Sequence, residues 1–125
     1  MKKGYYITAD GQKIDLKPIP ELMLGGLWAR NITELVIPDG VGAVWCHNEI
    51  LTKVTIPKGV KHAYFHDNQL TELILPDGID GVSCENNPHI KELILPDGIT
   101  YVDCDLGILD ITKYKNSSIE IILFI

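Results

Sequence analysis

The chain has 125 residues, which is enough for about one domain whose hydrophobic core needs no disulfide or metal to hold it. Its 17 acidic residues outnumber its 11 basic residues, and the net charge of −6 with no basic block excludes a nucleic-acid footprint and favours cationic partners. Three cysteines, an odd number, fit a reduced compartment better than a disulfide framework.

Residues 1–21 predict an N-terminal capping hairpin. The stretch YYITADGQKIDL alternates around Asp10-Gly11, which is a two-residue hairpin signal, and Tyr6, Thr8 and Ile14 suit packing onto the end of a core. The same stretch lacks the continuous apolar run of a signal peptide. We therefore expect a cytoplasmic protein, or a secreted or surface protein if a leader has been removed.

Internal repeats dominate residues 22–112. Four copies share an apolar pair followed by Pro-x-Gly: Leu35-Ile37-Pro38-Gly40, Val54-Ile56-Pro57-Gly59, Leu73-Leu75-Pro76-Gly78 and Leu93-Leu95-Pro96-Gly98. The copies are spaced by 19, 19 and 20 residues. A weaker first copy supplies Leu22, Gly25, Leu27 and Ile32.

One copy, Val60-x-x-Ala63-x-Phe65-x-x-Asn68-x-Leu70, resembles the consensus of leucine-rich repeats, and the following TELILPDG is similar to the short bacterial type. The resemblance implies a mainly β leucine-rich-repeat solenoid of about five copies, whose strand face usually meets partners. The consensus Asn is present only at Asn68 and Asn87, with Arg30, Glu49 and Gly107 elsewhere. We therefore expect its side-chain amide ladder to be interrupted.

Each copy should contribute a strand whose side chains alternate between the core and the outside. In VWCHN, this alternation sends Cys46 inward and His47 outward, so that the two cannot share one metal ion. Cys84 and Cys104 occupy the same inward column as Phe65, where cysteine acts as a small hydrophobe.

The outward positions of neighbouring strands should form three rows, because parallel strands lie about 4.8 Å apart. The predicted rows are Trp28-His47-His66-Glu85-Asp105, Gly26-Trp45-Tyr64-Ser83-Asp103 and Leu24-Ala43-His62-Gly81-Tyr101. Exposed Trp and Tyr are typical of binding hot spots, although sheet propensity and cross-strand pairing explain such rows equally well. The candidate partner-binding residues are Trp28, Trp45, His47, His62, Tyr64, His66, Glu85, Tyr101, Asp103 and Asp105.

These rows favour a protein or peptide partner of unknown identity and predict neither a cofactor nor an enzyme. The only residues with metal-like chemistry are His47, His66 and Glu85, but a flat ladder spreads ligands along a line while Zn²⁺ needs a tetrahedron. No phosphate-binding loop and no accessible pair of nucleophile and base can be found. We therefore expect no bound metal and no catalysis.

The other half of each repeat should form a back wall with an outward apolar row of Val36, Thr55, Ile74 and Ile94. This row could serve as a homodimer face or as a bed for the C-terminal segment, or it could reflect sheet propensity alone. Residues 113–125 predict a closing strand through Ile119, Ile121 and Ile122. The apolar run IEIILFI at 119–125 is too short to span a bilayer. A structural protein that self-associates through the ends of the solenoid or through the apolar row of the back wall is thus the alternative to a binding module.

Overall fold

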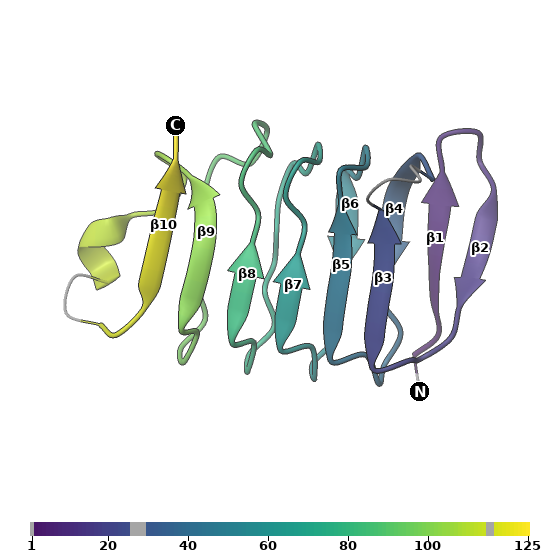
Figure 1. The fold of residues 1–125 in the computed structure, drawn as a ribbon, viewed down its shortest axis with the longest axis horizontal. Coiled ribbons are helices and arrows are strands. Elements are labelled where there is room, and N and C mark those ends of the chain that lie inside the picture. Colours follow the sequence, from purple (N-terminus) through teal and green to yellow (C-terminus); the bar gives the residue numbers. More distant parts are fainter. Residues whose placement is uncertain (1, 26–29, 115–116) are drawn as a thin grey trace.

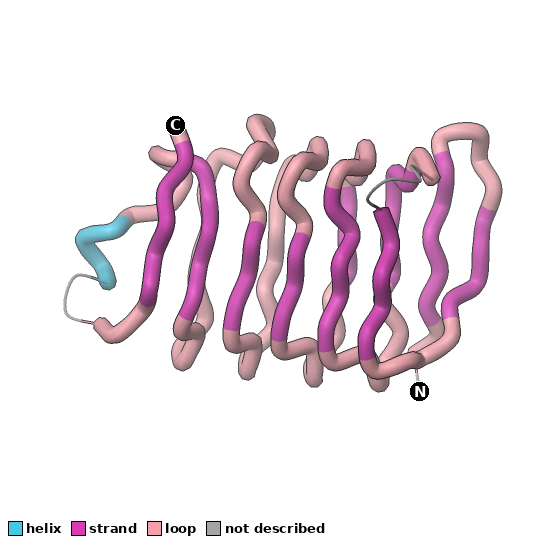
Figure 2. Tube along the Cα trace, viewed as in Figure 1, coloured by secondary structure: helices cyan, strands magenta, loops and turns pink. Residues whose placement is uncertain are grey.

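A computed structural model describes residues 2–25, 30–114 and 117–125 of the chain. It shows a mainly β solenoid of about five turns with parallel repeats of about 19 residues, so the predicted fold class is confirmed (Figures 1 and 2). The predicted outward residues Gly26 and Trp28 and the repeat residue Leu27 lie outside the described residues.

The front of the solenoid is a parallel sheet of six strands in the order β10-β9-β8-β7-β5-β3. These strands are β3 (Glu21–Gly25), β5 (Ala43–His47), β7 (His62–Tyr64), β8 (Gly81–Ser83), β9 (Tyr101–Asp105) and β10 (Glu120–Phe124). Trp45 pairs with Tyr64, and Ser83 pairs with Asp103, so from β5 onward the predicted rows have the expected register.

The back of the solenoid is a smaller mixed sheet in the order β2-β1-β4-β6. Its strands are β1 (Gly4–Thr8), β2 (Lys13–Leu16), β4 (Ile32–Val36) and β6 (Lys53–Thr55). The equivalent segments 72–76 and 92–96 form no strand, and the short 3-10 helix η1 (Ile111–Tyr114) follows them. Within the described ranges there is no α-helix.

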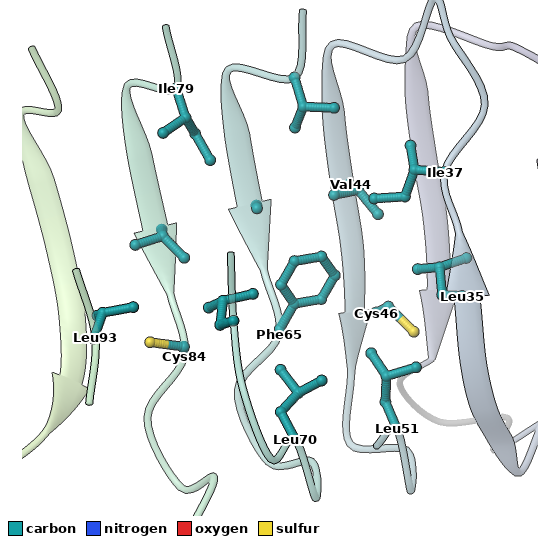
Figure 3. Close-up of a cluster of buried hydrophobic side chains, with 14 of the residues drawn as sticks. Leu35, Ile37, Val44, Cys46, Leu51, Phe65, Leu70, Ile79, Cys84 and Leu93 are labelled. Carbon is teal, nitrogen blue, oxygen red and sulfur yellow. The ribbon is translucent and has the colours of Figure 1, made fainter. Parts of the chain in front are cut away.

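The core lies between these two walls as a stack of inward side chains. Phe65 is fully buried at its centre, with Cys46 and Cys84 on the neighbouring turns of the same column (Figure 3). Burial raises the pKa of the Cys46 thiol to about 12 and that of the Cys104 thiol to about 11. The predicted role of the cysteines as buried hydrophobic residues is therefore confirmed.

The side chain of Asn68 bonds to four backbone groups at one corner of the solenoid, the weakest bond being that to the His66 carbonyl at 3.4 Å. Its amide nitrogen donates to the carbonyls of Cys46 at 2.7 Å and Phe65 at 3.0 Å, and its oxygen accepts the Leu51 N–H at 3.0 Å. Asn87 repeats this pattern one turn later with the Leu70 N–H. The two asparagines share the Phe65 carbonyl, which accepts both amide nitrogens at 3.0 Å, and each side chain helps to satisfy buried backbone groups at its corner.

Glu49 occupies the position of the consensus asparagine one turn before Asn68, where the sequence predicted an interruption of the side-chain ladder. Its carboxylate accepts the backbone N–H groups of Arg30 at 3.1 Å and Ile32 at 2.8 Å. Ile32 thereby receives the bond that Leu51 receives from Asn68. A carboxylate can replace the amide as acceptor but, when ionised, cannot donate to carbonyls, so only the accepting half of the pattern continues.

The register predicted for the first turn was wrong. Leu24 was expected on the outer face beside Ala43, but it pairs with Cys46 and is buried in the core. Leu22 precedes its partner Val44 by 22 residues, whereas Val44 precedes its partner Ala63 by 19. The three additional residues are an odd number, so they exchange the inner and outer faces of the first strand.

The N-terminal hairpin is confirmed, but its loop differs from the prediction. Thr8 N–H bonds to Gln12 C=O at 3.0 Å and Gly11 N–H to Thr8 C=O at 2.9 Å, so the loop has three residues and not two. Gly11 has a φ of 89°, a backbone conformation that residues other than Gly, Asn and Asp rarely adopt. Strand β1 then pairs antiparallel with β4, and Tyr6 and Leu16 pack against the core.

The C-terminal closing strand is also confirmed, and it extends the front sheet. Strand β10 pairs in parallel with β9, from Glu120 beside Tyr101 to Phe124 beside Asp105. Ile121 and Leu123 pack against the core. The alternative in which the C-terminal segment lies on the back wall is wrong for β10, which is hydrogen-bonded to β9 of the opposite sheet. Tyr114, near the start of this segment, does contact the back wall, where its hydroxyl accepts the Leu95 N–H at 3.4 Å.

We expect the replacement Asn68→Ala to lower the free energy of unfolding by about 3 kcal/mol, because it leaves one buried N–H and two buried carbonyls without this partner. Urea unfolding followed by circular dichroism would measure the change. The control Gln69→Ala alters the adjacent exposed residue and should cost less than about 0.5 kcal/mol. Equal losses in the two variants would contradict the role of the Asn68 amide.

Candidate functional site

The outer face of the front sheet, which we call the strand face, carries the predicted partner-binding residues on consecutive strands. Trp45 of β5 and Tyr64 of β7 stack with ring centroids 5.0 Å apart and an angle of 11° between the rings. In-register pairing of their strands places the two rings directly beside each other. Both side chains are half-buried, so the stack presents part of its apolar surface to solvent.

A second stack runs beside the first and consists of two imidazoles. The rings of His47 and His66 lie 4.7 Å apart at 13°. The Nδ1 atoms of both are shielded from solvent and have no hydrogen-bond partner among the described residues. Burial, followed by the nearby imidazole of His66, lowers the pKa of His47, while Asp67 and Glu49 act in the opposite direction.

At the other end of the strand face, a buried carboxylate collects two hydroxyl groups. Asp103 is only 8% exposed, and its Oδ2 accepts hydrogen bonds from the hydroxyls of Tyr101 and, at 3.2 Å, of Ser83. The bond to Asp103 raises the pKa of Tyr101 to about 12, which keeps the phenol protonated as a donor. Asp103 Oδ1 has no partner.

Glu85 and Asp105 lie in the row that contains the two imidazoles, but their environments differ. The carboxylate of Asp105 accepts the backbone N–H groups of Asn86 at 2.7 Å and Asn87 at 3.1 Å, and it therefore stabilises the loop that follows β8. Glu85 Oε2 is shielded from solvent and has no partner. Burial raises the pKa of Glu85, and the nearby charges of Asp103 and Asp67 act in the same direction.

His62 and Tyr101 flank Gly81 on the third row. A Cβ atom at Gly81 would lie 3.4 Å from the Tyr101 ring and 3.6 Å from His62 Nδ1, so the glycine leaves room for both side chains. The structure thus joins six of the predicted residues into two stacks, Trp45–Tyr64 and His47–His66, and one hydroxyl–carboxylate cluster that contains Tyr101 and Asp103. His62, Glu85 and Asp105 lie on the same face outside these groups. Trp28 alone among the predicted residues lies outside the described residues.

The sequence prediction missed the residues that the first and last strands add to the strand face. Met23 lies beside Trp45, and Ile122 and Phe124 lie beside Asp103 and Asp105. The spacing of 19 residues between Asp103 and Ile122 was the signal that could have revealed the last strand as another repeat. The three residues inserted in the first turn concealed Met23.

The strand face contains no group of ligands arranged for a metal ion. Within the described part of the chain, no three His, Cys, Asp or Glu side chains form such a group. The imidazoles of His47 and His66 are nearly parallel, so their nitrogen lone pairs do not converge on one point. Among the described residues, no helix has the length and apolar character needed to cross a membrane.

Comparisons with protein-family models, with curated proteins and with solved structures find no match to this chain. The site is therefore interpreted from its own geometry and chemistry.

We expect the stability of the protein to fall between about pH 7.5 and about pH 5, and to fall less in the variant His47→Phe. The pKa of His47 in the folded state lies below its ordinary value of 6.5, so the unfolded chain binds more protons as the pH falls through this range. Phenylalanine can retain the stack but cannot be protonated.

Urea unfolding of both proteins at the two pH values measures this difference. The matched control is His62→Phe, which removes an exposed imidazole of β7 outside the stack and should retain the pH dependence of the wild type. A loss in His47→Phe as large as that in the wild type would contradict the prediction.

Proposed function

We propose that the protein is a non-catalytic binding module that engages a protein or peptide through its strand face. The observation that carries this proposal is the stack of Trp45 on Tyr64, which is held in place by the paired strands β5 and β7 and remains partly open to solvent. Large aromatic side chains contribute most of the affinity in many interfaces.

The rigidity of the two stacks supports this function. A partner that binds to ordered side chains avoids the loss of rotamer entropy that association otherwise incurs, about 0.5–1.5 kcal/mol for each flexible side chain. Trp45 and His47 lie on β5 and Tyr64 lies on β7. His66 lies two residues beyond β7, where its carbonyl accepts the Asn48 N–H at 3.1 Å. Backbone hydrogen bonds therefore position all four residues. The binding surface is thus preorganised in the free protein.

Binding accounts for the residues of the strand face better than catalysis does. The thiols are the strongest nucleophiles of the chain, but Cys46, Cys84 and Cys104 are buried and their pKa values are raised, which keeps them protonated. Strand alternation separates each thiol from the imidazoles of the opposite face. A Cys–His pair with access to a substrate would need both groups on one side.

We also propose that the solenoid is of the leucine-rich-repeat kind. The consensus positions Val60, Ala63, Phe65, Asn68 and Leu70 are all buried in one turn. The Asn68 amide bonds to backbone groups at the corner, as a consensus asparagine should. A role in partner binding is consistent with the surfaces that solenoid proteins commonly use.

The double variant Trp45→Ala/Tyr64→Ala should lose a partner that the wild-type protein captures from a lysate of the source cells. Alanine removes both rings of the stack and with them most of the apolar contact area of this surface. Affinity capture followed by mass spectrometry, after circular dichroism has shown that both proteins fold, measures this loss.

The matched control is Ile74→Ala/Ile94→Ala, which removes two exposed apolar side chains from the back wall and should retain the captured partner. If the wild type and the Trp45→Ala/Tyr64→Ala variant capture the same proteins, the strand face is not the binding surface.

Self-association through the back wall is a second candidate function, and the exposure of two isoleucines favours it. Ile74 is 73% exposed and Ile94 is 68% exposed, and both line a groove of about 430 Å³ between segments 72–77 and 92–96. Val36, which the sequence placed in the same row, is only 8% exposed. The apolar surface is therefore limited to the C-terminal half of this wall.

If this second function holds, sedimentation equilibrium should detect a dimer of the wild type at micromolar concentration and a monomer of Ile74→Lys/Ile94→Lys. Charged side chains in an apolar contact are costly to desolvate. The control Met23→Lys introduces one lysine at an exposed position of the front sheet and should leave the dimer unchanged. A monomeric wild type would rule out association through this wall.

A further inference from the structure

We propose that the partner of the strand face is a cationic, arginine-bearing extended segment of another protein, whose guanidinium group binds to Glu85 and Asp103 and whose apolar side chain lies on the stack of Trp45 and Tyr64. This inference rests on the proposed binding function and specifies the chemistry of the partner.

Apart from its histidines, the acidic and basic side chains on the described part of the strand face all carry carboxyl groups. Among the described residues, its outward side chains from β3 to β10 include no lysine or arginine and five carboxylates: Glu21, Glu85, Asp103, Asp105 and Glu120. A positively charged partner is attracted to such a face, and an acidic one is repelled.

The proposed binding site for the guanidinium group is defined by two carboxylate oxygens that accept no hydrogen bond from the described residues. Asp103 is more than nine-tenths buried, and while its Oδ2 accepts two hydroxyl groups, its Oδ1 has no partner. Glu85 Oε2 is unpartnered in the same way. Unpaired buried acceptors are unfavourable in the free protein, and a guanidinium group carries five N–H donors that can satisfy both carboxylates.

Both free oxygens are screened from solvent in the unbound protein. The cation therefore reaches them after side chains of this face rotate, while the hydrogen-bonded strands below keep their register. Burial and the negative charge of Asp103 both raise the pKa of Glu85. A bound cation would offset the negative charge of Asp103 and so lower the pKa of Glu85 again. The observation on which the proposal depends is the geometry of these unpaired atoms.

The distance between the carboxylates and the aromatic stack sets the length of the partner segment. Asp103 lies three strands from Trp45 and two from Tyr64, which corresponds to about 10–14 Å at 4.8 Å per strand. An extended chain covers this distance in about four residues, so an arginine and an apolar residue four positions apart project from the same side of the chain and match both features. Arginine also stacks on aromatic rings better than lysine does.

The test uses a fluorescein-labelled synthetic peptide of seven residues with phenylalanine first, arginine fifth and serine elsewhere. The matched peptide replaces arginine by citrulline, which retains the shape and loses the charge. Fluorescence anisotropy with the full-length protein should show binding of the arginine peptide that is at least about tenfold tighter than binding of the citrulline peptide.

Two variants then locate the cation. Asp103→Asn and Glu85→Gln should each weaken binding of the arginine peptide about three- to tenfold, because each removes one carboxylate charge. Asparagine can still accept the hydroxyls of Tyr101 and Ser83, and Glu85→Gln provides a second measurement if the first variant does not fold. The control Glu92→Gln makes the same change of charge on the back wall and should alter binding less than twofold.

Three results would overturn the inference: no binding of the arginine peptide to the wild type at millimolar concentration, equal binding of the two peptides, or an equal effect of Glu92→Gln and Asp103→Asn. The proposed function has a separate outcome. A captured protein that requires Trp45 and Tyr64 but binds Asp103→Asn and Glu85→Gln normally would retain the strand face as a binding surface and reject only the cationic partner.

Discussion

Backbone hydrogen bonds join each turn of the solenoid to the next in register. This register positions both the buried columns and the outward rows of side chains. It places Val44, Ala63, Val82 and Val102 in one inward column and places Trp45 beside Tyr64 on the outside. A single turn would bury too little apolar surface to be stable, so each turn depends on its neighbours for both its hydrogen bonds and its core. The side chains of Asn68, Asn87 and Glu49 complete this pattern at the corners, where the backbone cannot satisfy itself.

The same register couples the core to the surface. Residues 46 and 47 differ by one position, yet one is a buried thiol and the other belongs to an imidazole stack. A shift of one residue would exchange these roles along a whole strand. Rows of identical spacing also bring like groups together, which explains why Trp45 meets Tyr64, why His47 meets His66, and why carboxylates gather toward β9.

The two walls of the solenoid offer different kinds of surface. The front sheet continues through six strands, so its outward side chains rest on an unbroken hydrogen-bonded support. The back sheet ends at β6, and grooves lie between the segments that follow it. The side chains of the strand face are held by the front sheet, which favours recognition of a partner through its aromatic rings and carboxylates. The exposed isoleucines of the back wall suit a less specific apolar contact.

The sequence by itself determined the solenoid, the buried columns and the rows from β5 to β9, because a repeat of 19–20 residues with alternating side chains allows only one way to bury its apolar positions. It failed where the period changes, in the first turn with its three additional residues. It also missed Glu49 as a substitute for asparagine and β10 as a further repeat. Only the tertiary structure decided the stacking of the rings, the convergence of Tyr101 and Ser83 on Asp103, and the unpaired atoms of Glu85 and Asp103. These features depend on side-chain rotamers that neighbouring strands select together, and a linear pattern contains no information about that choice.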